Sequence, residues 1–308
     1  MPELPDILVY RDCLTQRLLN TTINSLLIRF PFLLRTFDPP PDAVESHRIT
    51  DVSTLGKRIV ISCDNHISLV IHLMIAGRFR FIDSSAKTGL PSKIELARLR
   101  TTAGTLILTE ASQKKRASLH ILPTASLSTL DPGGLDPLTS TPDQLIAALR
   151  TPNRTIKRAL TDPHTIRGIG NAYSDEVLHA AKLSPITHTS RLTPDEWSRL
   201  AHAIPSTLNL WIARLQSEFA HTFPGPGDIT AFRPDFAVHG KFGKPCPVCQ
   251  TKVQRIVRAE NEFNYCPTCQ TGGKILADRS LSRLLGDDWP RTPEEWDDFD
   301  TPRPSTQP

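Results

Sequence analysis

Residues 244–270 read KPCPVCQTKVQRIVRAENEFNYCPTCQ and contain four of the chain's six cysteines. Each cysteine pair has the form Cys-Pro-x-Cys, and sixteen residues separate the two pairs. Two such knuckles present four thiolates with the spacing of a structural zinc site. The alternating residues between them predict a β-hairpin with a polar tip at 259–262. Because four protein ligands leave no open position, we expect one structural zinc ion on the four cysteines, Cys246, Cys249, Cys266 and Cys269.

The sequence on the N-terminal side of this module has helical periodicity. Three short segments carry apolar residues at helical spacing: 141–150, 153–162 and 171–183. Thr141 is a helix-capping residue before the first of them. Residues 193–219 predict one or two further helices, interrupted at Pro205 because proline removes a helix hydrogen bond. We therefore expect a helical domain over residues 143–235.

The start of the chain predicts a different architecture. Residues 5–19 have helical spacing, with Asp6 in the first turn. Six runs that alternate apolar and polar residues then follow at regular intervals: TINSLLIRF, KRIVISC, SLVIHL, GRFRFI, KIELARLR and GTLILT. This pattern predicts a β-sandwich or barrel within residues 1–130. A break rich in Pro, Gly, Ser and Thr at 129–142 separates it from the helical region.

The chain is thus predicted to be a multidomain α+β protein. Its parts are an N-terminal domain, a helical domain, a zinc module and a C-terminal extension: 1–130, 143–235, 243–272 and 273–308. The amphipathic stretch 272–285 predicts a short helix. The acidic residues after it either fold back on a basic surface or keep the chain in solution, and both alternatives stay open. The last residues, TPRPSTQP, are expected to be disordered.

Charge is distributed unevenly along the chain. Residues 286–308 carry seven acidic side chains against two arginines, whereas residues 1–285 carry 34 basic and 25 acidic side chains, a net charge of +9. A basic body favours a polyanionic partner such as nucleic acid. No stretch has the length and apolarity of a membrane span, and no secretory signal is visible. We expect a monomer in the cytoplasm, associated with the nucleoid.

The opening residues, MPELPD, contain a candidate nucleophile. Removal of Met1 would leave Pro2 with a free secondary amine. Attack of that amine on a sugar C1′ gives an iminium ion that is cationic without protonation, and the cation acidifies the C2′ hydrogen, so elimination follows. Glu3 is placed to move protons to and from the sugar oxygen. The alternative is that PELP is only a stiff segment leading into the first helix.

Four elements of this sequence occur in the order of one protein family. They are PELPD at the start, LGKRIV at 55–60, GIGNAYSDE at 168–176 and the late cysteine knuckles. The chain resembles the formamidopyrimidine-DNA glycosylase and endonuclease VIII family from residue 1 to about residue 272. The resemblance implies an N-terminal helix with a β-sandwich, a helix–two-turn–helix domain and a zinc-finger hairpin, with damaged double-stranded DNA in the cleft between the lobes. It also implies a bifunctional glycosylase and abasic-site lyase that removes oxidised or ring-opened bases in base-excision repair.

The resemblance assigns roles to individual residues. Pro2 matches the nucleophile and Glu3 the proton shuttle. Lys57 matches a lysine that contacts the lesion phosphate and assists catalysis, although a solvated turn lysine is the alternative. Asn171, preceded by Gly170, matches a phosphate-binding asparagine at a helix N-terminus, where backbone amides bind anions. The alternative for Asn171 is an ordinary helix cap.

The residues expected to fill the space of an extruded base depart from the family pattern. The family uses a methionine in HLxMxG, whereas residues 72–77 here read HLMIAG. Ile75 takes the wedge position with Met74 beside it, and the alternative is that Ile75 is a core-facing strand residue. A second family loop supplies an arginine and a phenylalanine. Here that loop has no aromatic residue and carries three cations expected to bind phosphates: Lys114, Lys115 and Arg116.

The zinc hairpin also departs from the family pattern. The family carries a phosphate-binding arginine five residues before the third cysteine, and Asn261 stands there in this chain. Arg258, three residues earlier, is a possible substitute. These departures support an alternative function, a catalytically reduced protein that binds DNA lesions or particular DNA structures, while Pro2, Glu3 and Lys57 together favour the enzyme. A zinc-ribbon transcription factor would leave the N-terminus unexplained.

Overall fold

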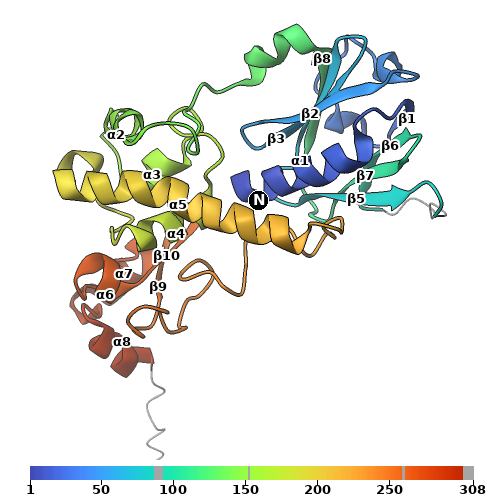
Figure 1. Cartoon of the computed structure of the whole chain (residues 1–308). Helices are drawn as coiled ribbons and strands as arrows, with labels where there is room; N and C mark the ends of the chain where they lie inside the picture. Colours follow the sequence, from blue (N-terminus) through green and yellow to red (C-terminus); the bar gives the residue numbers. More distant parts are fainter. Residues whose placement is uncertain (87–92, 152, 259–260, 301–308) are drawn as a thin grey trace, which may run out of the picture. The chain divides into compact units, whose positions relative to one another are not determined.

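The computed structural model describes residues 1–86, 93–151, 153–258 and 261–300 (Figure 1). Its backbone forms two compact units, which are described separately below. Unit 1 comprises Met1–Gly134 and Leu208–Thr230, and unit 2 comprises Leu135–Thr207 and the chain from Ala231 onward. Among the described residues, no helix combines the length and the apolarity that crossing a membrane requires.

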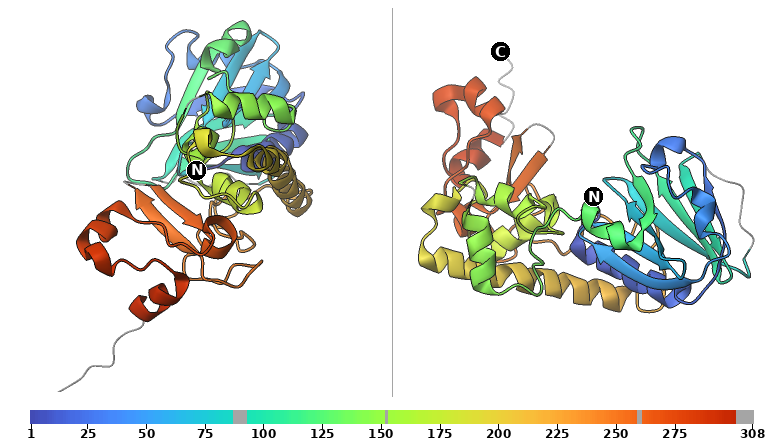
Figure 2. Two further views of the ribbon diagram at one scale, coloured as in Figure 1. Left: turned by 90° about the vertical axis from the view of Figure 1, so that its left-hand side faces the viewer. Right: turned by 90° about the horizontal axis from the view of Figure 1, so that it is seen from above.

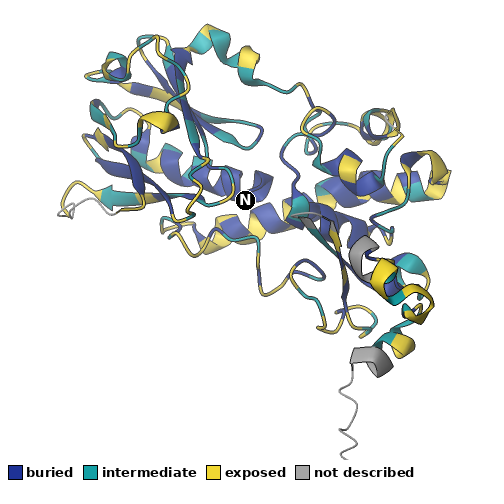
Figure 3. Ribbon diagram, turned by 180° about the vertical axis from the view of Figure 1, so that it is seen from behind, coloured by how far each residue is buried: buried dark blue, intermediate teal, exposed yellow. Residues whose placement is uncertain are grey.

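Unit 1 begins with helix α1, which spans Leu4–Leu18. Its start suits a helix, because a proline occupies the first turn and Asp6 adds an acidic side chain near the positive end of the helix dipole. Arg17 in the last turn complements the negative end. Most of its residues are buried, as Figure 3 shows, so this helix is part of the core rather than a surface element.

The described strands of unit 1 form two antiparallel four-stranded sheets, as the predicted β-sandwich requires. One sheet has the order β2-β3-β4-β8, with bounds Ile49–Leu55, Arg58–Cys63, Ile67–His72 and Ser118–Pro123. The other has the order β1-β6-β7-β5, with bounds Ile23–Ile28, Glu95–Thr101, Gly104–Glu110 and Gly77–Asp83. One apolar core takes residues from α1 and from both sheets, including Tyr10, Ile61, Phe79 and Leu108. Three short 3-10 helices complete the unit, at Pro31–Leu33, Pro41–Val44 and Thr124–Leu130.

Unit 2 contains the predicted helices. They are α2, α3 and α4, with bounds Pro142–Arg150, Ile156–Thr161 and Asn171–Ala180. A 3-10 turn that was not predicted follows at Thr189–Arg191. Thr141 caps α2, and its side chain accepts a hydrogen bond from the backbone of Gln144. Helix α5, Pro194–Glu218, contributes its first part to unit 2 and its last part to unit 1.

The expected interruption at Pro205 is wrong, because α5 continues through this residue. A proline inside a helix removes the hydrogen bond that its own nitrogen would donate, and its ring crowds the carbonyl one turn earlier. Ile204 and Leu208 on either side of it are fully buried. Their burial stabilises the continuous helix and offsets the lost hydrogen bond.

The zinc module consists of the predicted hairpin and a short helix. Strands β9 (Gln254–Arg258) and β10 (Asn261–Tyr265) pair in antiparallel register, and α6 spans Pro267–Thr271. The C-terminal extension then forms α7, a 3-10 turn and α8, with bounds Arg279–Leu285, Gly286–Asp288 and Pro293–Asp300. In the two views of Figure 2, these last helices lie beside the hairpin.

The extension packs on the zinc module through specific contacts. The backbone N–H of Val257 in β9 donates to Asp278 Oδ2 at 2.8 Å. The Trp296 ring of α8 contacts Phe242 edge to face, with 6.4 Å between centroids, and also contacts Trp289 at 5.8 Å. The described acidic residues therefore belong to a segment that folds back on the protein. The expected disordered end, TPRPSTQP, lies outside the described residues.

These aromatic contacts give the first prediction. Replacing Trp296 with alanine removes two edge-to-face pairs, each worth about 0.5–1.5 kcal/mol, and should loosen the extension from the zinc module. Hydrogen exchange followed by mass spectrometry should then show faster exchange in peptides covering Gln254–Arg258. Leu284→Ala is the matched control, because Leu284 lies in the same extension and is 80% exposed. Equal exchange in both variants would contradict the packing.

Candidate active site

The first residues of the chain are held in place before α1 begins. Pro2 and Glu3 are both buried, with only 3% of Glu3 exposed. The backbone N–H of Glu3 donates to Asp6 Oδ2 at 2.9 Å, and the Glu3 carbonyl accepts from the Ile7 N–H at 2.9 Å. The residue that follows the candidate nucleophile therefore has both of its backbone polar groups fixed by the first turn of the helix.

Several charged groups act on the amino terminus. Burial lowers the pKa of the Met1 amine, and the positive charges of Arg78 and Lys57 lower it further. Glu3 and Asp6 act in the opposite direction, but the pKa stays below its usual value. This balance favours the neutral amine, which is the form that can act as a nucleophile.

Lys57 belongs to a two-residue turn between β2 and β3. Leu55 pairs with Arg58, and Gly56 has a φ of +59°, a left-handed conformation that glycine adopts without steric cost. Lys57 is half-buried, and burial lowers the pKa of its ammonium group while Glu3 and Asp6 oppose that shift. The turn thus directs this lysine toward the two carboxylates at the start of α1.

His72 is a site residue that the sequence analysis did not single out. It is the last residue of β4 and pairs with Arg58 in the sheet register. Burial, followed by the positive charges of Arg58 and Lys57, lowers the pKa of its imidazole to about 4. The ring is therefore neutral at neutral pH and offers one hydrogen-bond donor and one acceptor. In the sequence, His72 is the first residue of HLMIAG. A single histidine at the end of a strand cannot be distinguished there from a core residue.

Met74 and Ile75 lie in the turn between β4 and β5, not in a strand. Ile75 is 54% exposed, so the alternative in which it faces the core is wrong. Met74 has a φ of +52°, which is uncommon for a residue with a side chain. Gly77 closes the turn, because a Cβ at that position would lie 2.3 Å from the Leu73 carbonyl oxygen. The turn therefore holds an apolar side chain out from the sheet.

The basic loop after β7 is anchored by the buried carboxylate of Glu110. This carboxylate accepts hydrogen bonds from the backbone N–H groups of Arg116, at 2.9 and 3.0 Å, and of Ala117, at 3.1 Å. Lys114 and Arg116 are exposed, whereas the Lys115 ammonium group donates to the Glu110 carbonyl. Two of the three expected cations therefore lie free on the surface of the loop, and the third stabilises its backbone.

The Met74–Ala76 turn and the basic loop that follows Glu110 leave the sheet at the same edge. Gly77, the first residue of β5, pairs with Glu110, the last residue of β7. The turn ends at Gly77 and the loop starts after Glu110. The pairing register of β5 and β7 therefore determines where both segments leave the sheet. An exposed apolar side chain and two exposed cations thus occupy neighbouring loops.

Unit 2 contains the second group of predicted site residues. Asn171 is the first residue of α4 and Gly170 is its N-cap, so the alternative in which Asn171 is the cap is wrong. The Asn171 side-chain amide donates to the Glu262 carbonyl of β10 at 2.8 Å. The asparagine therefore connects the N-terminus of α4 to the zinc hairpin. Gly168, with a φ of +87°, makes the turn that leads into the helix.

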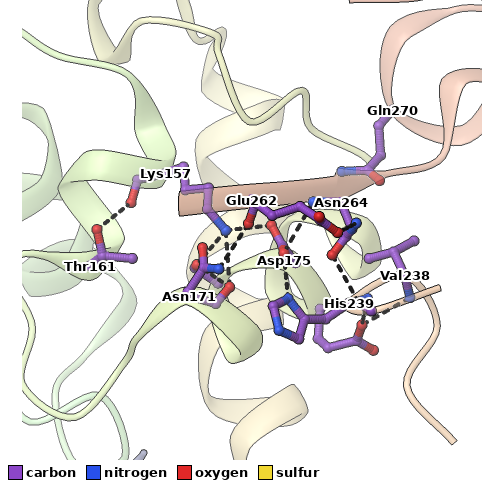
Figure 4. Close-up of polar contacts among 12 residues, drawn as sticks. Lys157, Thr161, Asn171, Asp175, Val238, His239, Glu262, Asn264 and Gln270 are labelled. Atoms are coloured by element: carbon purple, nitrogen blue, oxygen red, sulfur yellow. Dashed lines mark hydrogen bonds and ion pairs between the residues drawn. The ribbon is translucent and has the colours of Figure 1, made fainter. Parts of the chain in front are cut away.

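A buried polar network behind Asn171 was not predicted (Figure 4). The Lys157 ammonium group donates to the Asn171 carbonyl at 2.9 Å and to the Asp175 carboxylate. Asp175 also accepts from His239 Nδ1 at 2.7 Å and from the Asn264 N–H at 3.2 Å. Lys157 is 2% exposed and Asp175 fully buried, so the two charges compensate each other in a dry environment. Segments far apart in sequence thereby meet at one carboxylate.

The next residue of α4 has a similar role. The Glu176 carboxylate accepts hydrogen bonds from the backbone N–H groups of Ala237, Val238 and His239, at 2.8–2.9 Å. Burial raises the pKa of Glu176, and these hydrogen bonds oppose the shift. Helix α4 therefore holds the segment that leads into the zinc module.

Arg258 and Asn261 lie at the ends of the hairpin strands, where they pair with each other in the register. Their side chains lie outside the described residues. The role of Arg258 as a substitute for the family's arginine therefore stays a prediction.

The four cysteines have the geometry of one metal site. All four sulfur atoms lie within 4.8 Å of one another. The Cys246–Cys269 and Cys249–Cys266 sulfur distances are 3.9 and 3.3 Å, and ligands about 2.3 Å from a tetrahedral zinc lie about 3.8 Å apart. The cluster fits a single structural zinc. His179 of α4, which the sequence analysis missed, has Nε2 3.3 Å from the Cys246 sulfur, where an N–H supports a thiolate ligand.

Three domain models match the chain. The N-terminal domain of formamidopyrimidine-DNA glycosylase matches residues 1–117, the H2TH domain of that protein matches 134–221, and a zinc finger found in FPG and IleRS matches 243–272. The formamidopyrimidine-DNA glycosylase of Chloroflexus aurantiacus is 32% identical over 278 residues, which cover 88% of this chain and 98% of the relative. The chain belongs to the formamidopyrimidine-DNA glycosylase family. The resemblance and the fold class inferred from the sequence are thus confirmed.

Other relatives agree with this membership. An uncharacterized formamidopyrimidine-DNA glycosylase-like protein of Mycobacterium tuberculosis is 42% identical over 152 residues, covering 49% of this chain and 93% of that protein. The crystal structure of MutM (Fpg) from Thermus thermophilus matches with a TM-score of 0.73 at 27% identity, covering 87% of this chain and 98% of that one. As a member of the family, the chain is a DNA-repair glycosylase that binds DNA and carries a zinc finger. The extension from residue 273 lies beyond the matched zinc finger.

The zinc site gives the second prediction. Replacing Cys249 with serine removes one of four thiolates and should lower the zinc content from one ion per chain to nearly none, as measured by elemental analysis. Cys63→Ser is the control, because Cys63 is a buried residue of the unit 1 core and should leave the zinc content unchanged. A full zinc content in the Cys249 variant would contradict the assignment.

Proposed function

We propose that this protein is a bifunctional DNA glycosylase and abasic-site lyase that removes oxidised or ring-opened bases in base-excision repair. The observation that carries the proposal is the convergence of charged groups on the buried amino terminus. Lys57 and Arg78 favour the neutral amine, while Glu3 is buried beside it. Perturbed titratable groups cluster at functional sites, and an amine nucleophile requires its neutral form.

The proposed reaction begins after removal of Met1, when Pro2 carries the amine. The Pro2 nitrogen bonds to C1′ of the damaged nucleotide as the glycosidic bond breaks, and the base leaves with a proton. The sugar ring opens when its oxygen is protonated, and the C1′–nitrogen bond becomes an iminium. Loss of a C2′ proton then expels the 3′ phosphate and cuts the strand. Hydrolysis of the iminium releases the amine.

Glu3 and Lys57 are proposed to assist this sequence. Glu3 lies next to the nucleophile with its backbone fixed by Asp6, so its carboxyl group is suited to protonate the sugar oxygen and later accept a proton. Lys57 carries an ammonium group within electrostatic reach of Glu3 and is suited to bind the phosphate next to the lesion.

The DNA-binding residues are proposed from both units. In unit 1, the exposed Ile75 with Met74 beside it is suited to fill the space of an extruded base. Two exposed cations in the adjacent loop, Lys114 and Arg116, are suited to bind phosphates, and Lys115 orders that loop. In unit 2, Gly170 and Asn171 offer backbone amides at the N-terminus of α4 to a phosphate. The hairpin residues Arg258 and Asn261 are proposed to contribute next to the zinc site.

The preferred lesions are proposed to be formamidopyrimidines and other oxidised purines. Support comes from the formamidopyrimidine-DNA glycosylase of Chloroflexus aurantiacus, which is 32% identical over nearly its whole length. The alternative of a catalytically reduced DNA-binding protein is not favoured, because Pro2, Glu3 and Lys57 are all present.

The nucleophile gives the third prediction. Borohydride reduces an iminium to a stable amine, so it should trap a covalent adduct between the protein and DNA containing an abasic site. Pro2→Gly should reduce the adduct by at least about tenfold, because it replaces the secondary amine. Pro5→Ala is the control, since Pro5 lies in the same segment but has no free amine. Intact-protein mass spectrometry should show that Met1 is absent. Trapping at the wild-type level in Pro2→Gly would contradict Pro2 as the nucleophile, and bound DNA without any adduct in the wild type would contradict the lyase.

The proton shuttle gives the fourth prediction. Glu3→Gln removes a group that transfers protons and should slow base excision by about 100-fold or more, while the affinity for damaged duplex stays close to that of the wild type. Single-turnover excision and a gel-shift titration measure the two quantities. Glu218→Gln is the control, because Glu218 is exposed at the end of α5. A parallel loss of affinity would assign Glu3 a binding role instead.

A further inference from the structure

Arg78 is the second residue of β5 and directly follows the glycine that closes the Met74–Ala76 turn. Its Nη1 donates to the Ile75 carbonyl at 3.2 Å and to the Gly77 carbonyl at 2.7 Å. The guanidinium group thus binds the turn on which Ile75 is exposed. A planar group with several donors is suited to hold two carbonyls at a fixed separation.

The same side chain faces the start of α1. Its charge interacts with the Met1 amine, with Asp6 and with Tyr10. The backbone next to it is fixed to the same helix, because the Phe79 N–H donates to the Tyr10 hydroxyl at 3.3 Å and the two rings pack edge to face at 5.2 Å. Arg78 therefore lies between the exposed turn and the amino-terminal segment.

We propose that Arg78 is a positioning residue for the reaction: its guanidinium group holds the turn that carries Ile75 in a fixed place relative to the amino-terminal nucleophile. This inference rests on the proposed function. A base must leave the stack and its sugar must reach the amine in one geometry, and a displacement of about 1 Å between reacting groups costs about 100-fold in rate. A link between the turn and the nucleophile fixes that geometry.

The charge of Arg78 has a second consequence at the amine. Among the described residues, the charged groups that act on the amine are Glu3 and Asp6 of the N-terminal segment, Lys57 of the β2–β3 turn and Arg78 of β5. Burial is the largest cause of the lowered pKa of the amine, and Arg78 adds to it. Removing this cation should raise the pKa of the Met1 amine, and the same loss of positive charge should raise the pKa of the Pro2 amine once Met1 is removed, so a smaller fraction is neutral at pH 7.

Two substitutions distinguish the positioning role of the Arg78 guanidinium group from the effect of its positive charge. Arg78→Lys keeps the positive charge but loses the rigid guanidinium group whose Nη1 reaches both carbonyls, whereas Arg78→Met loses both the charge and that group. Excision from a lesion-bearing duplex should fall about tenfold or more in both variants. Trapping on a single-stranded oligonucleotide with an abasic site requires no extrusion of a base, so Arg78→Lys should retain it. Arg80→Met is the matched control, because Arg80 lies two residues along β5 and is exposed.

The pH dependence of N-terminal acylation, read by mass spectrometry of the first peptide, measures the amine without DNA. Its midpoint should move to higher pH in Arg78→Met and stay in place in Arg78→Lys and Arg80→Met. In Arg78→Met, a merely structural role would lower activity without moving this midpoint. Unchanged midpoint and unchanged duplex excision in Arg78→Met would overturn the inference. Absence of any borohydride adduct in the wild type would instead overturn the proposed lyase, and the acylation midpoint would still decide whether Arg78 acts on the amine.

Discussion

The burial of the amino terminus against charged side chains is the constraint on which the rest of the site depends. An amine in water is mostly protonated at neutral pH, and a protonated amine cannot attack carbon. Here desolvation and the cations Lys57 and Arg78 act against protonation, while Glu3 and Asp6 act for it. In the proposed reaction one of these two carboxylates, that of Glu3, transfers protons. The cations therefore balance them, and each comes from a different turn or strand of unit 1.

In unit 2, buried charged side chains of α4 hold the zinc module in place. A hairpin and a four-cysteine cluster have little apolar core of their own, so helix α4 must hold them. It does so through consecutive acidic residues: Asp175 meets Lys157, His239 and the Asn264 backbone, and Glu176 binds the segment that leads into the zinc module. Removing one partner of a buried pair leaves an uncompensated charge, which costs about 3–5 kcal/mol. Such a network allows few alternative arrangements of the helix and the hairpin.

Features set by local spacing could be predicted from the sequence, and features set by distant contacts could not. Four cysteines in two knuckles define a zinc site by themselves, and the alternation between them defines a hairpin. Lys157 has no such signal, because a buried lysine and a solvated one look alike when the partner, Asp175, is 18 residues away. The continuity of α5 through Pro205 depended on burial on both sides of that residue, which local propensity does not report. The sequence is compatible with Ile75 as a core-facing strand residue and as an exposed residue, and only its place in a turn decides between them.

The extension beyond the matched zinc finger changes how the departures from the family pattern are understood. The hairpin lacks the expected arginine at position 261, yet it is held from two sides. On β10, the Glu262 carbonyl accepts from Asn171, and on β9 the Val257 N–H donates to Asp278 of the extension. Val257 directly precedes Arg258, so the second contact orders the backbone next to the remaining cation. A segment that is ordered before it meets its partner loses less conformational entropy on binding. The extension therefore orders the backbone beside Arg258 before any partner binds.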